Sequence, residues 1–299
     1  MPSLGSNTRQ QRANQIAQHL QGSPHGTIGM DVAGYAVITG AGSGIGRATA
    51  LTLAREGATG IALLDLDQKA LDAVGVEVEA AAAACGTPIR VYRATVDVRN
   101  ESDVTTAINN VAQEFGRLDY LINCAGVAFK HPGGAAEAAS EDWSRVVDIN
   151  LNGTFYALRA AAKIMLQQDW TRSSRDGRPL QRGSIVNIGS ICGVVGVALS
   201  TAYTASKHGV IGLTRTAAVD YAGSGLRINA VCPGYVDTPM VTKDQTLAEV
   251  ARRSAEQKVP LQRLARAQEV ADSIVFLCGG RSSYITGSTL MVDGGFTAQ

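Results

Sequence analysis

The sequence predicts an α/β fold in which a doubly wound, Rossmann-like parallel sheet of about seven strands is covered by helices on both faces. From Gly34 onward, short apolar runs alternate with longer stretches of helical pattern. The runs are continuously apolar and bounded by Gly, Asp or Asn, as expected of strands buried on both faces of a parallel sheet. A glycine-rich loop follows the first run directly, where a strand turns into a helix in nucleotide-binding units.

The individual elements follow from the same pattern. Strands are predicted over residues 35–39, 61–65, 89–96, 119–123, 184–189, 227–231 and 289–292, and helices over 45–56, 68–84, 101–115, 141–168, 203–222 and 268–277. We expect 171–182 to be a solvated insertion and 237–257 a mobile substrate lid. Residues 31–299 are predicted to form one catalytic domain because no linker interrupts them, and 1–30 are expected to be a flexible extension.

Composition excludes several classes of protein. The 299 residues are 45% hydrophobic and 18% charged with a net charge of +1, which is typical of a globular protein and gives no reason to expect nucleic acid or an acidic membrane as partner. No apolar run approaches the ~18 residues of a membrane span. The five cysteines are dispersed, which predicts free thiols in a reducing compartment and no metal site. We expect a cytoplasmic protein, with a mitochondrial presequence as the alternative because no acidic residue precedes Asp31.

The loop after the first predicted strand reads TGAGSGIG and spans Thr39–Gly46. Three of its glycines, Gly40, Gly44 and Gly46, permit a tight turn and a close approach of the backbone to a pyrophosphate. Ile45 begins a helix whose first amides face that phosphate. A glycine cluster alone would suit any tight strand-to-helix turn, but this one lies inside the first β–α–β unit. The loop therefore predicts a dinucleotide site.

An acidic residue, Asp65, ends the second predicted strand about 20 residues after the loop, where a carboxylate can accept hydrogen bonds from both adenosine ribose hydroxyls. A helix N-cap or a solvated strand end is the alternative interpretation. A 2′-phosphate would bring charge to within ~4 Å of Asp65, a repulsion of roughly 4 kcal/mol per unit charge at an effective dielectric of ~20. No basic residue interrupts the loop, although Arg47 follows it. We therefore expect NAD(H) rather than NADP(H).

Tyr203 and Lys207 lie four residues apart in the run STAYTASKHGVIG. If this run is helical, the spacing stacks both side chains on one face. The pKa of a free phenol is about 10, so an adjacent ammonium that favours the phenolate would let the phenol act as an acid or base closer to neutral pH. A surface pair is the alternative, and the pair alone does not decide between the two.

Taken together, these motifs resemble those of the short-chain dehydrogenase/reductase family in its single-domain form. The resemblance runs from about Gly34 to Gly295. The glycine loop matches the family motif TGxxxGxG, and NCAG at 123–126 matches its NxAG element. CPGYVDTPM matches its PG element, and VDGG occurs near the C-terminus.

The resemblance implies a catalytic tetrad of Asn150, Ser190, Tyr203 and Lys207. Tyr203 would take the alcohol proton during oxidation and return it during reduction, which typically contributes about 10²–10⁴-fold in rate. Ser190 would hydrogen-bond the substrate oxygen, and Asn150 would hold a water that links Lys207 to solvent. The implied function is an NAD-dependent oxidoreductase that interconverts a secondary alcohol and a ketone by hydride transfer.

The same resemblance implies the residues that contact the cofactor and the substrate. The cofactor set is Gly40, Ser43, Gly44, Ile45, Gly46, Asp65, Asp97, Val98, Asn123, Ala125, Gly126, Tyr203, Lys207, Pro233, Gly234, Val236 and Thr238. The candidate substrate pocket comprises His131, Cys192, Val194, Leu199, Tyr235 and Met240. Because most pocket residues are apolar, we expect a neutral substrate that is apolar or cyclic.

Two other functions suit this fold: lyase, isomerase or cyclase chemistry in the same site, and a non-catalytic NAD sensor. A sensor predicts a broken tetrad, and this tetrad is whole. Intact tetrad residues also argue against the other chemistries. Finally, the resemblance implies a homotetramer or homodimer in which the predicted helices 141–168 and 203–222 pair between subunits.

Overall fold

A parallel sheet of seven strands forms the centre of the computed structural model, which describes residues 30–174 and 176–299. The strand order is β3-β2-β1-β4-β5-β6-β9, and every neighbouring pair is parallel. The strands are β1 (Tyr35–Thr39), β2 (Gly60–Asp65), β3 (Arg90–Thr95), β4 (Tyr120–Asn123), β5 (Gly183–Ile188), β6 (Leu226–Pro233) and β9 (Thr289–Val292). Because the strand order reverses between β1 and β4, a crevice is expected at the carboxyl ends of these two strands.

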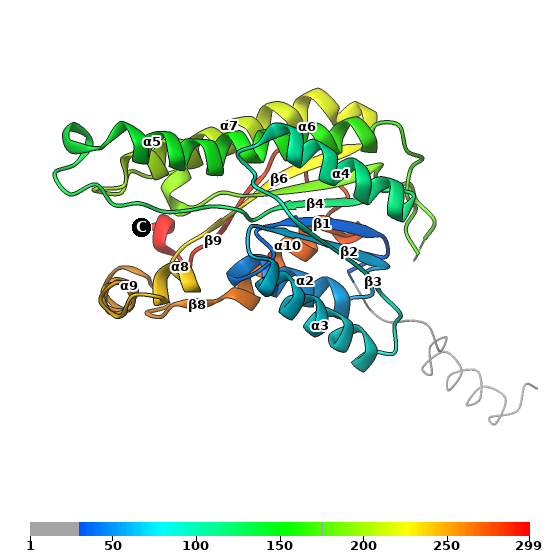
Figure 1. The fold of residues 1–299 in the computed structure, drawn as a ribbon, viewed down its shortest axis with the longest axis horizontal. Coiled ribbons are helices and arrows are strands. Elements are labelled where there is room, and N and C mark those ends of the chain that lie inside the picture. Colours follow the sequence, from blue (N-terminus) through cyan, green and yellow to red (C-terminus); the bar gives the residue numbers. More distant parts are fainter. Residues whose placement is uncertain (1–29, 175) are drawn as a thin grey trace, which may run out of the picture.

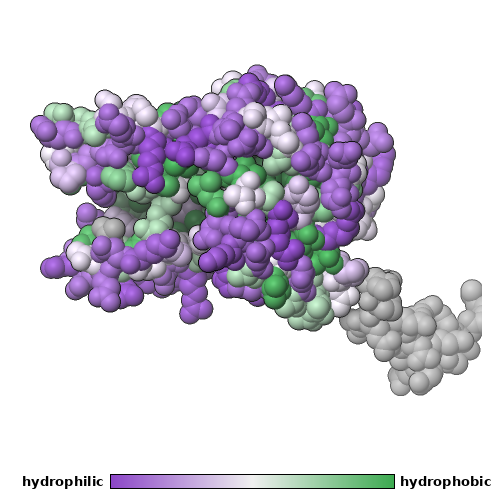
Figure 2. Space-filling view, in the orientation of Figure 1, coloured by the Kyte–Doolittle hydropathy of each residue, from purple (hydrophilic) through white to green (hydrophobic). Residues whose placement is uncertain are grey.

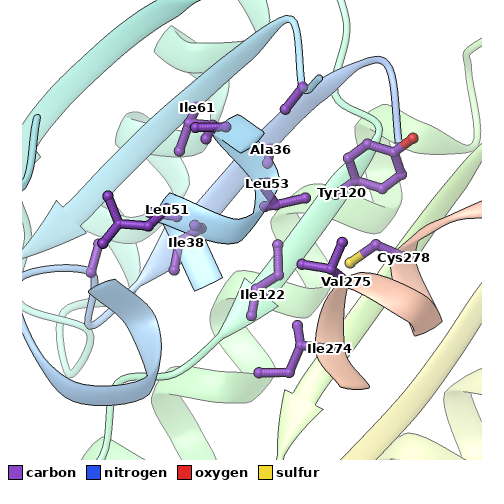
Figure 3. Packing of buried hydrophobic residues seen from close by; sticks show 14 of the residues in the cluster. Ala36, Ile38, Leu51, Leu53, Ile61, Tyr120, Ile122, Ile274, Val275 and Cys278 are labelled. Atoms are coloured by element: carbon purple, nitrogen blue, oxygen red, sulfur yellow. The ribbon is translucent and has the colours of Figure 1, made fainter. Parts of the chain in front are cut away.

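Helices cover both faces of the sheet (Figure 1). One layer holds α2 (Gly44–Arg55), α3 (Gln68–Ala84) and α10 (Ala267–Cys278), and the other holds α4 (Glu101–Phe115), α6 (Gly153–Met165) and α7 (Thr201–Tyr221). Along β1, Ala36 and Ile38 pack into the first layer, whereas Val37 between them packs into the second. Figure 3 shows the first of these cores, in which side chains of β1, β4, α2 and α10 pack together. The predicted doubly wound α/β fold is confirmed.

The predicted strands match the observed ones to within two residues at each end, and so do all the predicted helices but one. The exception is the stretch 141–168, which was expected to be a single helix. It divides into α5 (Ser140–Val147), a π-helical turn at Asp148–Asn152, and α6. The side chain of Asn150 in this turn is bonded to the backbone of Val127 rather than to its own helix. A π-turn inserts one extra residue, and here it holds a buried amide against another segment.

The stretch 171–182 also differs from the expected solvated insertion. Its two ends pair across an Arg172–Pro179 bridge, and Ser173, Leu180 and Gln181 are buried. The Gln181 side chain donates to the carbonyl of Cys278 and accepts from the buried Arg227. The loop is therefore anchored to the end of α10, because Gln181 satisfies buried polar groups of Cys278 and of Arg227 on β6.

The predicted lid region contains α8 (Pro239–Thr242) and α9 (Gln245–Lys258), and its first residue lies in β7 (Val236–Asp237), which pairs with β8 (Ala265–Arg266). The predicted extension, 1–30, lies outside the described residues except for Met30. Among the helices that the structure describes, none is long and apolar enough to cross a membrane. All five cysteines are free thiols.

Candidate active site

Many of the predicted site residues gather at one edge of the sheet, because they follow or end parallel strands. Gly40 follows β1, Asp65 ends β2, Asp97 and Val98 follow β3, and Asn123 ends β4. On the other side of the switch point, Ser190 follows β5 and Pro233 ends β6. Carboxyl ends of parallel strands lie together, and ligands of such sheets bind in the crevice beyond them.

The glycine loop can only be built from glycines at its critical positions. Gly40 and Gly44 have φ of +65° and +53°, in the left-handed region that disfavours a side chain. A Cβ on Gly46 would clash with the carbonyl oxygen of Gly40. Ser43 precedes α2 in an extended conformation and its side chain makes no capping hydrogen bond. The first amides of α2 are thus available to an anion.

The carboxylate of Asp65 faces this loop. Its Oδ2 accepts from the amide of Gly42 at 2.9 Å, and its Oδ1 accepts from the amide of Asp67 at 3.2 Å. Arg47, the basic residue just beyond the loop, is ion-paired with Glu77 on α3. The positive charge of Arg47 is therefore engaged by a carboxylate other than Asp65.

Asp97 is engaged by a neighbour that the sequence did not single out. Arg99 donates to both carboxylate oxygens, with Nε–Oδ1 and Nε–Oδ2 distances of 3.0 Å each. This hydrogen bonding lowers the pKa of Asp97 below its ordinary value. Any ligand that uses the Asp97 carboxylate shares it with Arg99. Val98 is buried and lies against Gly153, where a Cβ would come within 2.9 Å of its side chain.

Close backbone approaches join the strand-end loops into one surface. A Cβ on Gly40 would lie 2.7 Å from the amide nitrogen of Ala125, and one on Gly44 would lie 3.4 Å from Cγ2 of Thr238. Thr238 is the N-cap residue of α8, so the glycine loop touches both the NCAG loop and the start of the predicted lid. The sequence placed these three segments far apart, and the fold brings them into contact.

Three of the predicted catalytic side chains lie together beside this surface. Ser190 caps a short 3₁₀ turn (Ile191–Gly193), and its hydroxyl accepts from the amide of Cys192 at 3.1 Å. Tyr203 and Lys207 occupy one face of α7, with Nζ of Lys207 5.6 Å from the centre of the Tyr203 ring. Nζ also donates to the carbonyl of Ile188, at the end of β5, at 2.7 Å. Ser190 and Lys207 are therefore both held at the carboxyl end of β5, Ser190 by the chain itself and Lys207 by a hydrogen bond.

In the protein without cofactor, burial has a larger effect than neighbouring charges on the pKa values of Tyr203 and Lys207. Burial raises the pKa of Tyr203 to about 12, while the nearby Ser190 side chain acts in the opposite direction. Burial lowers the pKa of Lys207 to about 8, so the amine is still mostly charged at pH 7. The expected stabilisation of the phenolate by Lys207 is outweighed here by desolvation.

Asn150 is fully buried and lies in the π-turn. Its amide Nδ2 donates to the carbonyl of Val127 at 2.9 Å and to Oγ of Ser206 at 3.1 Å, while Oδ1 accepts from the amide of Val127 at 2.8 Å. A Cβ on Gly126 would lie 3.3 Å from Oδ1 of Asn150 and 3.7 Å from Nζ of Lys207. Asn150 and Lys207 thus face the same point of the NCAG loop.

The candidate substrate residues lie in several different surroundings. Cys192 is buried beside Ser190, whereas Val194, Leu199 and Met240 are exposed. Figure 2 shows the surface hollowed between the part of the molecule that carries α5 and the part that carries α8 and α9. Tyr235 instead lines a cavity of about 470 Å³ with residues of 259–269 and the end of β9, and no tetrad residue lines that cavity.

His131 lies in the loop after β4, with its backbone amide bonded to the carbonyl of Leu199 at 2.8 Å. Only 3% of the residue is exposed, and its Nε2 is buried without a hydrogen-bond partner. His131 was expected to rim a pocket. Its side chain is instead buried, where the loop after β4 is hydrogen-bonded to the loop before α7.

Comparison with known proteins places this arrangement in a family. Residues 40–297 match the family model described as enoyl-(acyl carrier protein) reductase. The short-chain dehydrogenase fogB of Aspergillus ruber is 40% identical over 270 residues, which cover 90% of this chain and 98% of that protein. The chain belongs to the short-chain dehydrogenase/reductase family. The predicted membership is confirmed, and with it an oxidoreductase family that uses a nicotinamide cofactor.

Two further similarities bear on this short-chain dehydrogenase/reductase. The cis-4-hydroxycyclohexanecarboxylate dehydrogenase of Sinomonas cyclohexanicum is 41% identical over 264 residues, covering 88% of this chain and 96% of that protein. The crystal structure of levodione reductase superposes with a TM-score of 0.77 at 32% identity, covering 90% of this chain and 98% of the other. Both matches cover about nine tenths of this chain and nearly the whole length of the other protein.

The residues present fit the dinucleotide that the family uses. The helix start with uncapped amides suits a pyrophosphate, the loop has no Cβ at Gly40, Gly44 and Gly46, and Asp65 faces the loop. Four residues that complete the site were missed in the sequence: Arg99, Glu77, Ser206 and Val127. Arg99 and Glu77 could have been suspected from their charge, whereas Ser206 and Val127 gave no signal because one is a common helix residue and the other acts through its backbone.

Proposed function

We propose that this short-chain dehydrogenase/reductase is an NAD-dependent enzyme that interconverts a secondary alcohol and a ketone. The observation that carries the proposal is the placement of Tyr203, near Ser190 and beneath the amine of Lys207, at the sheet edge that also bears the glycine loop. The nicotinamide supplies or accepts the hydride when bound. This chain's residues hold the substrate oxygen and move its proton.

Each tetrad residue receives a role that its contacts support. Ser190 holds the substrate oxygen next to Tyr203, and Tyr203 takes or returns the proton. Lys207 keeps positive charge near the phenol and binds the nicotinamide ribose. Asn150 links the NCAG loop to α7 beside Lys207, where a water can reach the amine. The remaining predicted cofactor contacts, Asp97, Val98 and those at 233–238, are proposed to surround the adenine and the carboxamide.

We assign NAD(H) rather than NADP(H) as the cofactor. Asp65 faces the loop with its carboxylate, and Arg47, the basic residue nearest the loop in sequence, is paired with Glu77. A 2′-phosphate beside Asp65 would meet uncompensated negative charge. Binding constants for NADH and NADPH, measured by the fluorescence of the nicotinamide, test this assignment; equal or tighter binding of NADPH would contradict it.

The substrate is proposed to be neutral and either apolar or cyclic. The exposed side chains of Val194, Leu199 and Met240 are apolar and bring no fixed charge to the surface beside Ser190. A relative named for a hydroxycyclohexanecarboxylate supports a cyclic alcohol, although that compound carries a carboxylate.

We propose that the catalytic domain is 31–299 and that the segment 237–257 closes over the bound substrate. Limited proteolysis with and without NADH tests the closure, because bound NADH should protect this segment from cleavage.

We also propose that the enzyme is a cytoplasmic homotetramer or homodimer. Trp143 on α5, Phe155 on α6 and Val219 on α7 are exposed apolar side chains on the helices predicted to pair. The free thiols of its five cysteines suit a reducing compartment. Light scattering tests the assembly, and a clean monomer at micromolar concentration would contradict it.

The decisive experiment mixes the purified protein with NAD⁺ and a pool of neutral secondary alcohols at mildly alkaline pH and follows NADH. Turnover that falls about 10²–10⁴-fold in Tyr203→Phe supports the proposal. Tyr284→Phe is the matched control, because that tyrosine is fully exposed and removing its hydroxyl should change nothing. Full activity in Tyr203→Phe would show that the proposed acid–base role is wrong.

A further inference from the structure

Ser206 lies between Tyr203 and Lys207 on α7 and is fully buried. Its hydroxyl donates to the carbonyl of Tyr203 at 2.8 Å and accepts from Nδ2 of Asn150 at 3.1 Å. The proposed reaction gives this side chain no role. A serine inside a helix often bonds back to its own backbone, but here it also holds a residue from another element.

The orientation of the Asn150 amide follows from its partners. The backbone N–H of Val127 can only donate and its C=O can only accept, so Oδ1 and Nδ2 of Asn150 are distinguished by these two bonds. One hydrogen of Nδ2 goes to Val127, which leaves the other for an acceptor in a buried site. Ser206 supplies that acceptor. Without it, the amide would keep an unsatisfied donor away from water.

These bonds form a continuous path through the proposed active site. It runs from the NCAG loop at Val127, through Asn150 in the π-turn, to Ser206 and the backbone of Tyr203. Asn150 and Lys207 both approach the same point beside Gly126. The hydrogen bonds of Asn150 to Val127 and Ser206 therefore fix the distance between the NCAG loop and the face of α7 that carries Tyr203 and Lys207.

We propose that Ser206 is a positioning residue: it holds the Asn150 amide, and through it the NCAG loop, in register with Tyr203 and Lys207. The inference rests on the proposed function, since it assigns Ser206 a part in that same site. Ser206 touches neither substrate nor cofactor in this role, and it acts through Asn150.

The same helix provides a matched control. Thr214 is also fully buried, accepts from Nδ2 of Asn187 at 2.9 Å and donates to the carbonyl of Val210 at 2.7 Å. It makes the same pair of bonds about two helical turns farther from Tyr203. Ser206→Ala and Thr214→Val each remove one buried hydroxyl with little change of shape, so both variants should lose stability. Thr214 reaches the proposed site only at second hand, through Asn187, which accepts from Nδ2 of Asn123 at 2.9 Å. Ser206 holds the tetrad residue Asn150 directly, so Ser206→Ala should disturb the site more.

The test combines kinetics with two measurements that need no turnover. We expect Ser206→Ala to lower kcat about tenfold and to displace the pH profile of kcat, while the NADH dissociation constant changes less than about twofold. Thr214→Val should keep the kcat and pH profile of the parent. The inference would be overturned if Ser206→Ala kept the kcat and the pH profile of the parent. It would also be overturned if Thr214→Val lowered kcat and displaced the pH profile as much as Ser206→Ala does.

The structural link is measured separately on the cofactor-free protein. The side-chain amide protons of Asn150, assigned by their loss in Asn150→Ala, should exchange slowly in the parent protein and much faster in Ser206→Ala. Ser206→Ala should also cost less unfolding free energy in the Asn150→Ala background than in the parent. Unchanged exchange and additive losses would overturn the link. If the parent turns over no alcohol, the proposed reaction fails, and these two measurements still decide the inference.

Discussion

Nζ of Lys207 lies 5.6 Å from the centre of the Tyr203 ring and donates to the carbonyl of Ile188, so its charge is directed at the end of β5. The amine is thereby anchored at a fixed height over the phenol ring. Burial sets the titration of both groups in the chain alone, raising the pKa of Tyr203 and lowering that of Lys207. The proposed acid–base chemistry accordingly requires further positive charge at the site, which oxidised nicotinamide carries.

Cofactor binding should change the titration of Tyr203. The absorbance of its phenolate, taken as the difference between the parent and Tyr203→Phe, should appear with a midpoint near pH 12 in the cofactor-free protein, because burial raises the pKa to about 12. Saturating NAD⁺ should move the midpoint to lower pH, since positive charge favours the phenolate. A midpoint that NAD⁺ leaves in place would contradict the proposed mechanism.

Replacing Lys207 should stabilise the cofactor-free protein. Its folded-state pKa of about 8 lies below the ordinary 10.5, so the unfolded chain binds more protons between pH 8 and 10.5 and the parent gains stability as pH rises through this window. Below pH 8 the cost of the buried charge is fully present. The free energy of unfolding of Lys207→Met at pH 7 should therefore exceed that of the parent by about 1–3 kcal/mol. The loss of the hydrogen bond to the carbonyl of Ile188 reduces this gain.

Chemical denaturation at pH 7 and pH 10 measures this difference, which should shrink at the higher pH. Lys69→Met is the control, because Lys69 is exposed on α3 and its removal should leave stability within about 0.5 kcal/mol at both pH values. A Lys207→Met protein that is less stable than the parent at pH 7 would show that the buried charge is better compensated than these contacts indicate.

Adding a methyl group to the glycine loop should block the cofactor. A Cβ on Gly46 would clash with the carbonyl of Gly40, so Gly46→Ala should weaken NADH binding more than tenfold and lower stability by about 1–3 kcal/mol. Gly223→Ala is the control, since nothing lies within 4 Å of its Cβ position. Calorimetric titration with NADH and thermal unfolding measure both effects, and normal NADH affinity in Gly46→Ala would refute the assigned role of the loop.

Removing the charge of Asp65 should relax the choice of cofactor. Asp65→Asn should raise the affinity for NADPH relative to NADH at least about tenfold, because the repulsion of a 2′-phosphate is lost. Adding Glu77→Gln, which frees Arg47, should extend the shift. Asp72→Asn is the control for an exposed carboxylate on the same side of the sheet. An unchanged NADPH-to-NADH ratio in Asp65→Asn would contradict the assignment.

The strands and most helices could be read from the sequence because their signals are local. β1 coincides with the predicted run, and α3 and α4 begin and end where the pattern does. Their caps, Asp67 and Asn100, lie directly before them and accept from amides of the first turn. A family resemblance added the other candidate site residues to the glycine loop, Asp65 and the pair of Tyr203 and Lys207, and the roles of all of them stay predictions until they are tested by substitution.

Only the tertiary structure decided the features that depend on distant partners. The π-turn within 141–168 is held by Val127, 23 residues away from Asn150, and the loop 171–182 is anchored by Gln181 to Cys278, 97 residues away. Ser206 became a candidate only when Asn150 was seen to need a second acceptor. The pKa of Tyr203 likewise reversed the expectation from spacing, because desolvation depends on everything packed around the phenol and not on the lysine four residues along the helix.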